Sequence, residues 1–182
     1  LTSFTSQYIR LLYPCILNYK NGVMITDMDM LPMNRTYYTQ NIKSYDNNKF
    51  INLREKMGNQ IPMCYNVALP TIWKNIFQIN SLQDIKDRIK LVFKNNTIIE
   101  GHGNRGWFMD QKDLYKMVMN WNIKTNNFIH LKDKNTGFKR LNRGFILNNN
   151  EIMKIKKNIS KGLYSDYHCY RPMNKYSKIN YY

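Results

Sequence analysis

The chain has 182 residues, of which 43% are hydrophobic and 14% aromatic, enough apolar material for one folded domain with a full core. This composition excludes a disordered chain, and no apolar run reaches the roughly 20 residues that a membrane span needs. The first residues lack the basic end and the long apolar stretch of a secretory signal. Three widely spaced cysteines indicate reduced thiols rather than a disulfide framework. We therefore expect a single domain over residues 1–182, without a membrane span and in the cytoplasm.

The formal net charge of +16 has two interpretations. Lysine, asparagine, isoleucine and tyrosine are all abundant, and an AT-rich coding sequence produces this bias without any functional cause. The alternative is an anionic partner, because a positive field gathers ligands such as nucleotide diphosphates or nucleic acids.

The N-terminal quarter predicts a helix followed by a buried strand. Residues 6–18 repeat apolar side chains at helical spacing, and Pro14 interrupts or restarts this helix. Residues 23–26 are apolar on both faces, which is typical of a central strand in a parallel sheet. The polar, tyrosine-rich residues 34–49 predict a loop or a short helix.

The middle of the chain predicts a second strand and two helices. Residues 61–68 form the strand candidate, and Pro62 confines it to a sheet edge or to a strand's start. A helix follows over residues 71–79. In the next helix, Ser81 is the expected N-cap and Asp84 reaches back to complete a capping box.

The second half of the chain begins with a glycine-rich loop over residues 101–106. The segments expected after it are a helix over 110–121, a strand over 128–131, a basic hairpin or extended segment over 137–145, a helix over 150–159, and a tail over 163–182 that has no periodicity and packs back over the sheet.

Two aspartates follow the first predicted strand. Asp27 and Asp29 are two residues apart, so on an extended chain their side chains point the same way. Two converging carboxylates make a hard, negative oxygen site that suits Mg²⁺ or Mn²⁺, and such an ion can hold a substrate diphosphate on its far side. The alternative is a pair of solvated turn aspartates.

Three blocks of the sequence, at residues 6–33, 107–115 and 164–172, together resemble nucleotide-sugar glycosyltransferases of the A-type (GT-A) fold. They occur in family order, and the pattern is similar to small glycosyltransferases encoded by large DNA viruses. The resemblance implies an α/β fold with a mixed, mainly parallel sheet flanked by helices. Only 26 residues precede Asp27, too few for a complete strand–helix–strand unit, so we expect an N-terminally incomplete chain that lacks most of the nucleotide-binding half.

The resemblance also implies a catalytic centre. Asp27, Asp29 and His168 correspond to the metal ligands, for Mn²⁺ or Mg²⁺. Asp110 corresponds to a carboxylate that faces the sugar and the acceptor; it is the general base in an inverting enzyme and positions the donor sugar in a retaining one. An N-terminal helix cap is a second role open to Asp110.

The remaining site residues are expected to contact the donor and the acceptor. On the donor side the resemblance implies Arg10, Arg171 and Lys175, although Arg171 stands where the family has glycine and Lys175 falls one position late. The alternative for Arg10 is a solvated helix arginine. On the acceptor side we expect Trp107, by stacking on a sugar, then His102 on its mobile loop and Asn66 after a strand.

The function expected from these features is transfer of a sugar, most simply from a UDP-sugar, to a glycan, protein or small-molecule hydroxyl. One alternative is a degenerate glycosyltransferase site, which keeps these residues and has lost turnover. The alternative class is a basic nucleic-acid-binding protein, for which no known motif is present and the lysines are scattered, so nucleic acid is not the expected partner. A metal-dependent nuclease or phosphohydrolase needs more acidic ligands than this chain offers near Asp27.

Overall fold

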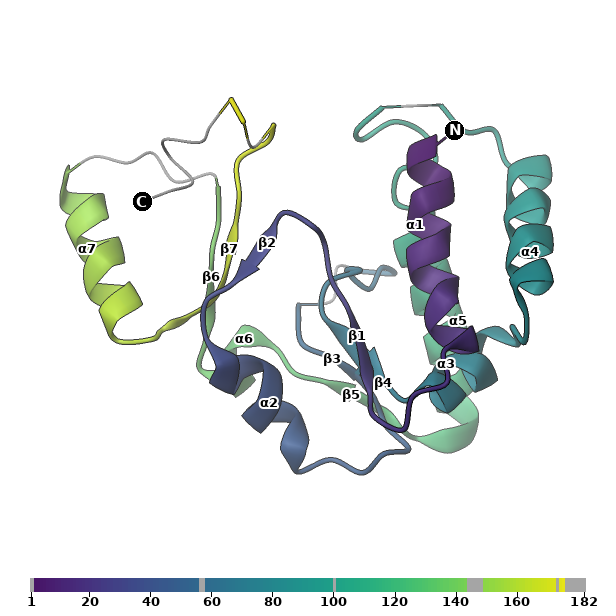
Figure 1. Ribbon diagram of the computed structural model, residues 1–182, viewed down its shortest axis with the longest axis horizontal. Coiled ribbons are helices and arrows are strands. Elements are labelled where there is room, and N and C mark those ends of the chain that lie inside the picture. Colours follow the sequence, from purple (N-terminus) through teal and green to yellow (C-terminus); the bar gives the residue numbers. More distant parts are fainter. Residues whose placement is uncertain (1, 56–57, 100, 144–148, 173, 176–182) are drawn as a thin grey trace. The chain divides into compact units, whose positions relative to one another are not determined.

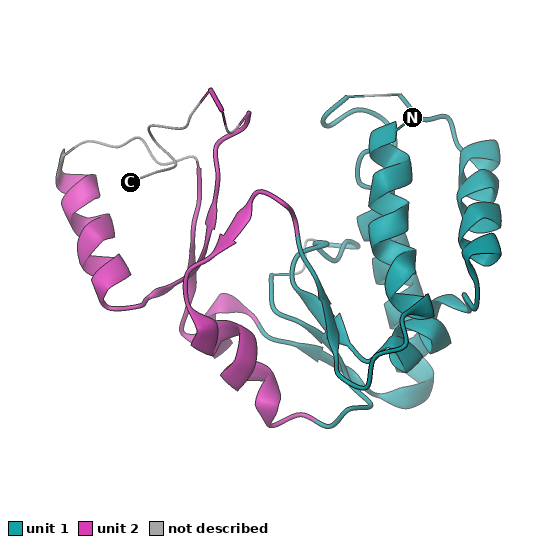
Figure 2. Cartoon of the chain, viewed as in Figure 1, with its two compact units in different colours: residues 1–26, 46–131 teal, residues 27–45, 132–182 magenta. Residues whose placement is uncertain are grey.

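The structure is a computed structural model that describes residues 2–55, 58–99, 101–143, 149–172 and 174–175 (Figure 1). It contains two compact units, each made of two separate stretches of the chain (Figure 2). Unit 1 contains residues 1–26 and 46–131, and unit 2 contains residues 27–45 and 132–182. That the whole chain forms one domain stays a prediction.

Unit 1 is built on a four-stranded mixed sheet. Its short strands lie in the order β1 (Val23–Ile25), β4 (Asn66–Ala68), β3 (Phe50–Asn52) and β5 (Phe128–His130). Strand β4 pairs antiparallel with both β1 and β3, and β3 pairs parallel with β5. Val67 of β4 faces Met24 on one side and Ile51 on the other, so β-branched and other apolar residues meet across the sheet.

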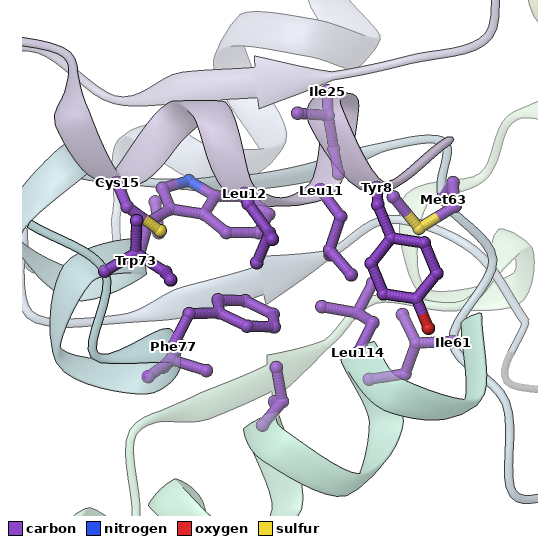
Figure 3. Packing of buried hydrophobic residues seen from close by; sticks show 14 of the residues in the cluster. Tyr8, Leu11, Leu12, Cys15, Ile25, Ile61, Met63, Trp73, Phe77 and Leu114 are labelled. Carbon is purple, nitrogen blue, oxygen red and sulfur yellow. The ribbon is translucent and has the colours of Figure 1, made fainter. Parts of the chain in front are cut away.

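The core of unit 1 lies between this sheet and its helices (Figure 3). Helix α1 packs against α4 and α5. Trp73 on α3 stacks at 6.1 Å on Phe77, one turn later, and the ring of Phe50 from β3 meets Trp73 edge-on at 4.8 Å. These apolar contacts join sheet and helices into one cluster. The helical elements are α1 (Thr2–Leu12), the 3-10 helix η1 (Tyr13–Ile16), α3 (Pro70–Phe77), α4 (Leu82–Asn95) and α5 (Met109–Thr125).

The helix boundaries in unit 1 follow local sequence signals. The backbone changes from α1 to the tighter η1 at Tyr13, and Pro14 lies in the first turn of η1, so the interruption predicted at Pro14 is present. Pro70 occupies the first turn of α3, where its missing N–H costs nothing. The capping box of α4 is present: the Ser81 hydroxyl accepts a hydrogen bond from the Asp84 amide, and the Asp84 carboxylate accepts one from the Ser81 amide.

Unit 2 contains a three-stranded mixed sheet. Strand β7 lies in the middle, antiparallel to β2 and parallel to β6 (Figure 1). Helix α2 packs on β7, and the hydroxyl of Tyr38 on this helix donates a hydrogen bond to the Ser165 carbonyl. The elements are β2 (Met30–Pro32), α2 (Arg35–Lys43), α6 (Asp133–Thr136), β6 (Lys139–Leu141), α7 (Asn149–Ser160) and β7 (Tyr164–His168).

The fold class is mixed α/β, with mixed sheets flanked by helices, and the expected predominance of parallel pairing is wrong. Strand β1 lies at one end of its sheet and pairs antiparallel, so it is not a central parallel strand; both of its faces are apolar, but its first two residues are only half-buried. The strand predicted over 61–68 is confined to β4, which begins after Pro62 and lies inside the sheet. The tail contains a strand, β7, that was not predicted.

Among the described helices, none combines the length and the apolar character that crossing a bilayer requires.

Candidate functional site

Asp27 and Asp29 lie in a reverse turn at the start of unit 2. The Met30 amide donates a hydrogen bond to the Asp27 carbonyl at 3.2 Å, which closes the turn over residues 27–30. Met28 at its tip is fully exposed, whereas Asp29 is buried. The prediction that Asp27 and Asp29 lie on an extended segment is therefore wrong. Their side chains do not point the same way by virtue of strand geometry. Ligation by Asp27 stays a prediction.

The pairing of β2 with β7 brings Asp29 to His168, 139 residues further along the chain. Met30 lies opposite His168, and the Cys169 amide donates a hydrogen bond to the Asp29 carbonyl at 2.8 Å, which extends the ladder past the strand ends. The side chains of Asp29 and His168 therefore meet at one end of the sheet.

The parallel pairing of β6 with β7 adds a residue that sequence reasoning missed. Leu141 lies opposite Tyr167, so Arg143 leaves β6 at the same end of the sheet where Cys169 leaves β7. Its guanidinium Nη1 is 3.4 Å from the Cys169 carbonyl oxygen. The basic composition of residues 137–145 was the available signal, but it did not indicate which strand the segment would join.

Four side chains form what we call the Asp29 cluster: Asp29, Arg143, His168 and Arg171. The Oδ2 atom of Asp29 is 2.8 Å from Nε of Arg171, 3.2 Å from Nη1 of Arg143 and 3.2 Å from Nε2 of His168. The Asp29 side chain is 11% exposed and that of Arg171 is 50% exposed, so the cluster reaches solvent on the arginine side. Asp29, His168 and Arg171 were predicted together, and the structure brings them together.

The surroundings of His168 favour its neutral form. Burial lowers the pKa of His168 and the nearby charge of Arg143 lowers it further, while the Asp29 carboxylate opposes both with a smaller effect. Nε2 lies 3.2 Å from Oδ2 of Asp29, and Nδ1 lies 3.4 Å from the Asn142 amide oxygen. A carboxylate oxygen only accepts hydrogen bonds, so the contact with Asp29 requires a proton on Nε2, and a metal ion would bind Nε2 only after this proton has left.

The donor set fits a divalent ion in part. Two ligands bound at right angles, each about 2.1 Å from an ion, lie about 3.0 Å apart, and Oδ2 of Asp29 is 3.2 Å from Nε2 of His168. Among the described residues no group of three His, Cys, Asp or Glu side chains is arranged to hold a metal ion. Asp29 and His168 thus offer two donor atoms at a spacing that one ion could bridge.

A buried ion pair supports the strands behind the cluster. Nε of Arg140 on β6 donates to Oδ2 of Asp166 on β7 at 2.8 Å, and the Ser165 hydroxyl donates to Oδ1 of Asp166 at 2.5 Å. Asp166 is fully buried. A buried carboxylate with both oxygens hydrogen-bonded fixes the register of the two strands that carry Arg143 and His168.

Two other predicted site residues meet in unit 1. Arg10 on α1 donates from Nη2 to Oδ2 of Asp110 at 3.2 Å, and the Gln111 amide donates to Oδ1 at 2.8 Å. Asp110 lies in the first turn of α5, where the helix dipole favours a carboxylate. Its side chain is 1% exposed. The N-cap of α5 is Phe108, without a side-chain cap hydrogen bond, so the cap role considered for Asp110 is wrong, and its catalytic role stays a prediction.

A second polar contact between α1 and α5 lies one turn away. The Tyr8 hydroxyl donates to Oδ2 of Asp113 at 2.5 Å, and burial together with this hydrogen bond raises the pKa of Tyr8 well above its ordinary value. Sequence reasoning missed this pair, because its two residues lie 105 positions apart in the chain. The two contacts fix how α1 lies along α5.

The predicted acceptor residues occupy different environments. His102 and Trp107 lie together in the glycine loop, their rings 4.9 Å apart, and Trp107 also meets the buried Phe4 ring. Asn66 is fully buried; its amide bonds to Asn52 and to two backbone carbonyls. Asn66, like Asp110, has almost no exposed surface, so contact with an acceptor would require its surroundings to open, and its acceptor role stays a prediction.

Lys175 follows the cluster in sequence and is exposed. Its backbone amide is hydrogen-bonded to the Pro172 carbonyl and to the Asn174 side chain. These contacts shape the turn after Arg171, and the predicted contact of Lys175 with a diphosphate stays a prediction.

No protein-family model, curated protein or solved structure matches this chain.

Proposed function

We propose that this protein is a metal-dependent glycosyltransferase of the GT-A type that moves a sugar from a nucleoside diphosphate sugar, in the simplest case a UDP-sugar, to a hydroxyl acceptor. The observation that carries the proposal is the meeting of Asp29 with His168 and two arginines at one end of the β2-β7-β6 sheet. Carboxylate and imidazole suit Mn²⁺ or Mg²⁺, and guanidinium groups suit diphosphate oxygens.

Each residue of the Asp29 cluster has a role in this proposal. Asp29 and the neutral His168 hold the ion, with Asp27 as a further ligand. Arg143 and Arg171 bind the diphosphate oxygens and offset the negative charge that grows on them as the sugar leaves. When bound, the ion supplies Lewis-acid assistance to the departing diphosphate.

The acceptor side of the proposal involves residues of unit 1. Asp110 is the candidate for the general base or for a group that positions the sugar, and Trp107 and His102 are the candidates for acceptor contact. Because Arg10 and the Gln111 amide occupy the Asp110 carboxylate, this role requires the carboxylate to exchange one of these partners for the substrate.

The test of the proposal is thermal stabilisation of the protein by a panel of nucleotide sugars, with and without Mn²⁺. We expect one donor to raise the melting temperature only when the ion is present. If no donor shifts the melting temperature with either Mn²⁺ or Mg²⁺, the proposal is wrong.

Replacing Asp29→Ala should abolish sugar transfer and donor hydrolysis alike, because the ion loses a ligand and the arginines lose their fixed partner. The exposed Asp87 on α4 offers a matched control, and Asp87→Ala should keep wild-type turnover. Circular dichroism of both variants checks that the fold is intact. Wild-type turnover by a folded Asp29→Ala protein would contradict the assignment.

A further inference from the structure

The two arginines of the Asp29 cluster bind the carboxylate that the proposed function assigns to the divalent ion. Arg171 and Arg143 both contact Oδ2 of Asp29, the same atom that faces Nε2 of His168. Two guanidinium groups occupy the lone pairs of this oxygen and their positive charges repel an arriving cation, and guanidinium groups engaged by a carboxylate are less available to a phosphate. The contacts in the structure therefore oppose the binding of both ligands.

We infer that Arg143 and Arg171 exchange Asp29 for the substrate diphosphate, so that the anion releases the carboxylate and the released carboxylate binds the divalent ion. The inference rests on the proposed function for the identity of the anion and adds to it how the site is regulated. Asp29 is then a competitor of the anion as well as a ligand of the metal.

The exchange is physically reasonable because only short side-chain movements are needed. The Arg171 side chain is half-exposed and contacts Asp29 through Nε, so an arriving anion can reach its guanidinium group from the solvent. A diphosphate presents several charged oxygens in the geometry that guanidinium groups bind in a bidentate manner. Each ligand removes the contact that opposes the other, so the ion and the diphosphate bind with positive coupling.

The first test uses inorganic pyrophosphate in the presence of EDTA, with calorimetry as the readout. Asp29→Asn frees both arginines and should tighten pyrophosphate binding about tenfold, the size expected for removing one contacting charge at a partly exposed site. Asp87→Asn removes the same charge on the exposed surface of α4 and should change the affinity less than about threefold. Equal effects of the two variants, or an unchanged affinity in Asp29→Asn, would overturn the exchange.

The second test uses Mn²⁺ alone, followed by the electron paramagnetic resonance of the free ion. Arg171→Gln and Arg143→Gln should each raise the affinity for Mn²⁺ about tenfold and lower the affinity for pyrophosphate about tenfold. Lys161, an exposed lysine of unit 2, is the matched control, and Lys161→Gln should leave both affinities within about twofold. Arginine variants that behave like the lysine control would contradict the inference. This test does not need the Asp29→Asn protein, so it remains valid if that variant does not fold.

These measurements separate the inference from the proposed function. Neither test uses a sugar or turnover. The predicted pyrophosphate and Mn²⁺ responses in a protein that no nucleotide sugar stabilises would sustain the exchange and reject the glycosyltransferase. An Mn²⁺-dependent rise of the melting temperature with a nucleotide sugar, combined with unchanged Mn²⁺ and pyrophosphate affinities in the arginine variants, would support the glycosyltransferase and reject the exchange.

Discussion

Asp110 carries a charge inside unit 1, and Arg10 is a cation that contacts it. Replacing Arg10→Met should lower the free energy of unfolding by about 1–3 kcal/mol. We expect a loss near the lower end of this range, because the Arg10 side chain is 27% exposed. Urea denaturation measures the loss, and Lys116→Met on the exposed side of α5 is the control. An Arg10→Met loss no larger than that of the control would show that the pair contributes nothing.

At the scale of residues, sequence reasoning found the partners that carry recognisable chemistry. Asp29, His168 and Arg171 were selected by residue type and by order along the chain, and the structure places them around one oxygen atom. Arg143 was missed because its position depends on which strand accepts β6, and short-range pattern does not encode that choice. The structural role of Asn66 was missed, because a buried amide that closes a turn and a polar residue after a strand look alike in sequence.

At the scale of elements, the capping box of α4 makes a prediction about pH. The hydrogen bond from the Asn80 amide is the main cause that lowers the pKa of Asp84, with further bonds from Ser81. The stabilisation is therefore present above the unfolded pKa of about 3.9 and is lost as the pH falls through the lower folded value. Asp84→Asn should be less stable than wild type at pH 7, and the difference should shrink below about pH 3.

The neutral partner of the capping box provides the control. Ser81→Ala should cost about 1 kcal/mol through the lost N-cap, and part of this cost should persist at low pH, because a hydroxyl does not titrate there. Chemical denaturation at several pH values measures both variants. A pH-independent difference between Asp84→Asn and wild type would contradict the role of the carboxylate.

Helices were predicted better than strands for a physical reason. The helices of this chain are marked by caps, prolines and repeated apolar spacing, all of which act within a few residues, as Pro14, Pro70 and Ser81 show. Six of the seven strands in the described residues have three residues, too few for an alternating pattern to emerge. Strands β2, β3 and β7 depend on partners far along the chain, so sequence reasoning did not predict them.

At the scale of the whole molecule, all three cysteines are buried thiols. Burial raises the pKa of Cys15 from 9.0 to about 12, and burial also raises the pKa of Cys169. At pH 8 the thiolate of Cys15 is then about a thousandfold scarcer than in the unfolded chain. Ellman's reagent should react with three thiols at once in guanidinium chloride and only slowly in the native protein. Rapid native reaction of Cys15 would show that its part of the core opens easily.

The net charge predicts how the protein meets nucleic acid. The exposed lysines are scattered over many elements, so we expect random oligonucleotides to bind weakly at low salt and to lose about 10³–10⁵ in affinity between 50 and 200 mM salt if six to ten phosphates are contacted. Fluorescence anisotropy against salt measures this. Tight binding that survives 200 mM salt, with no affinity for nucleotide sugars, would favour the nucleic-acid-binding alternative.

The two units also have a consequence for synthesis of the protein. Asp29 is synthesised before residues 46–131, whereas its partners Arg143, His168 and Arg171 follow them in the second segment of unit 2. At about 5–20 residues per second, several seconds pass while residues 46–131 are made. During this interval the nascent chain carries an acidic turn that has not yet met its cations. Chaperones and nucleotides can therefore meet unit 1 before the cluster of unit 2 exists, and the chain must be made as far as Arg171 before any ligand of the complete cluster can stabilise the fold.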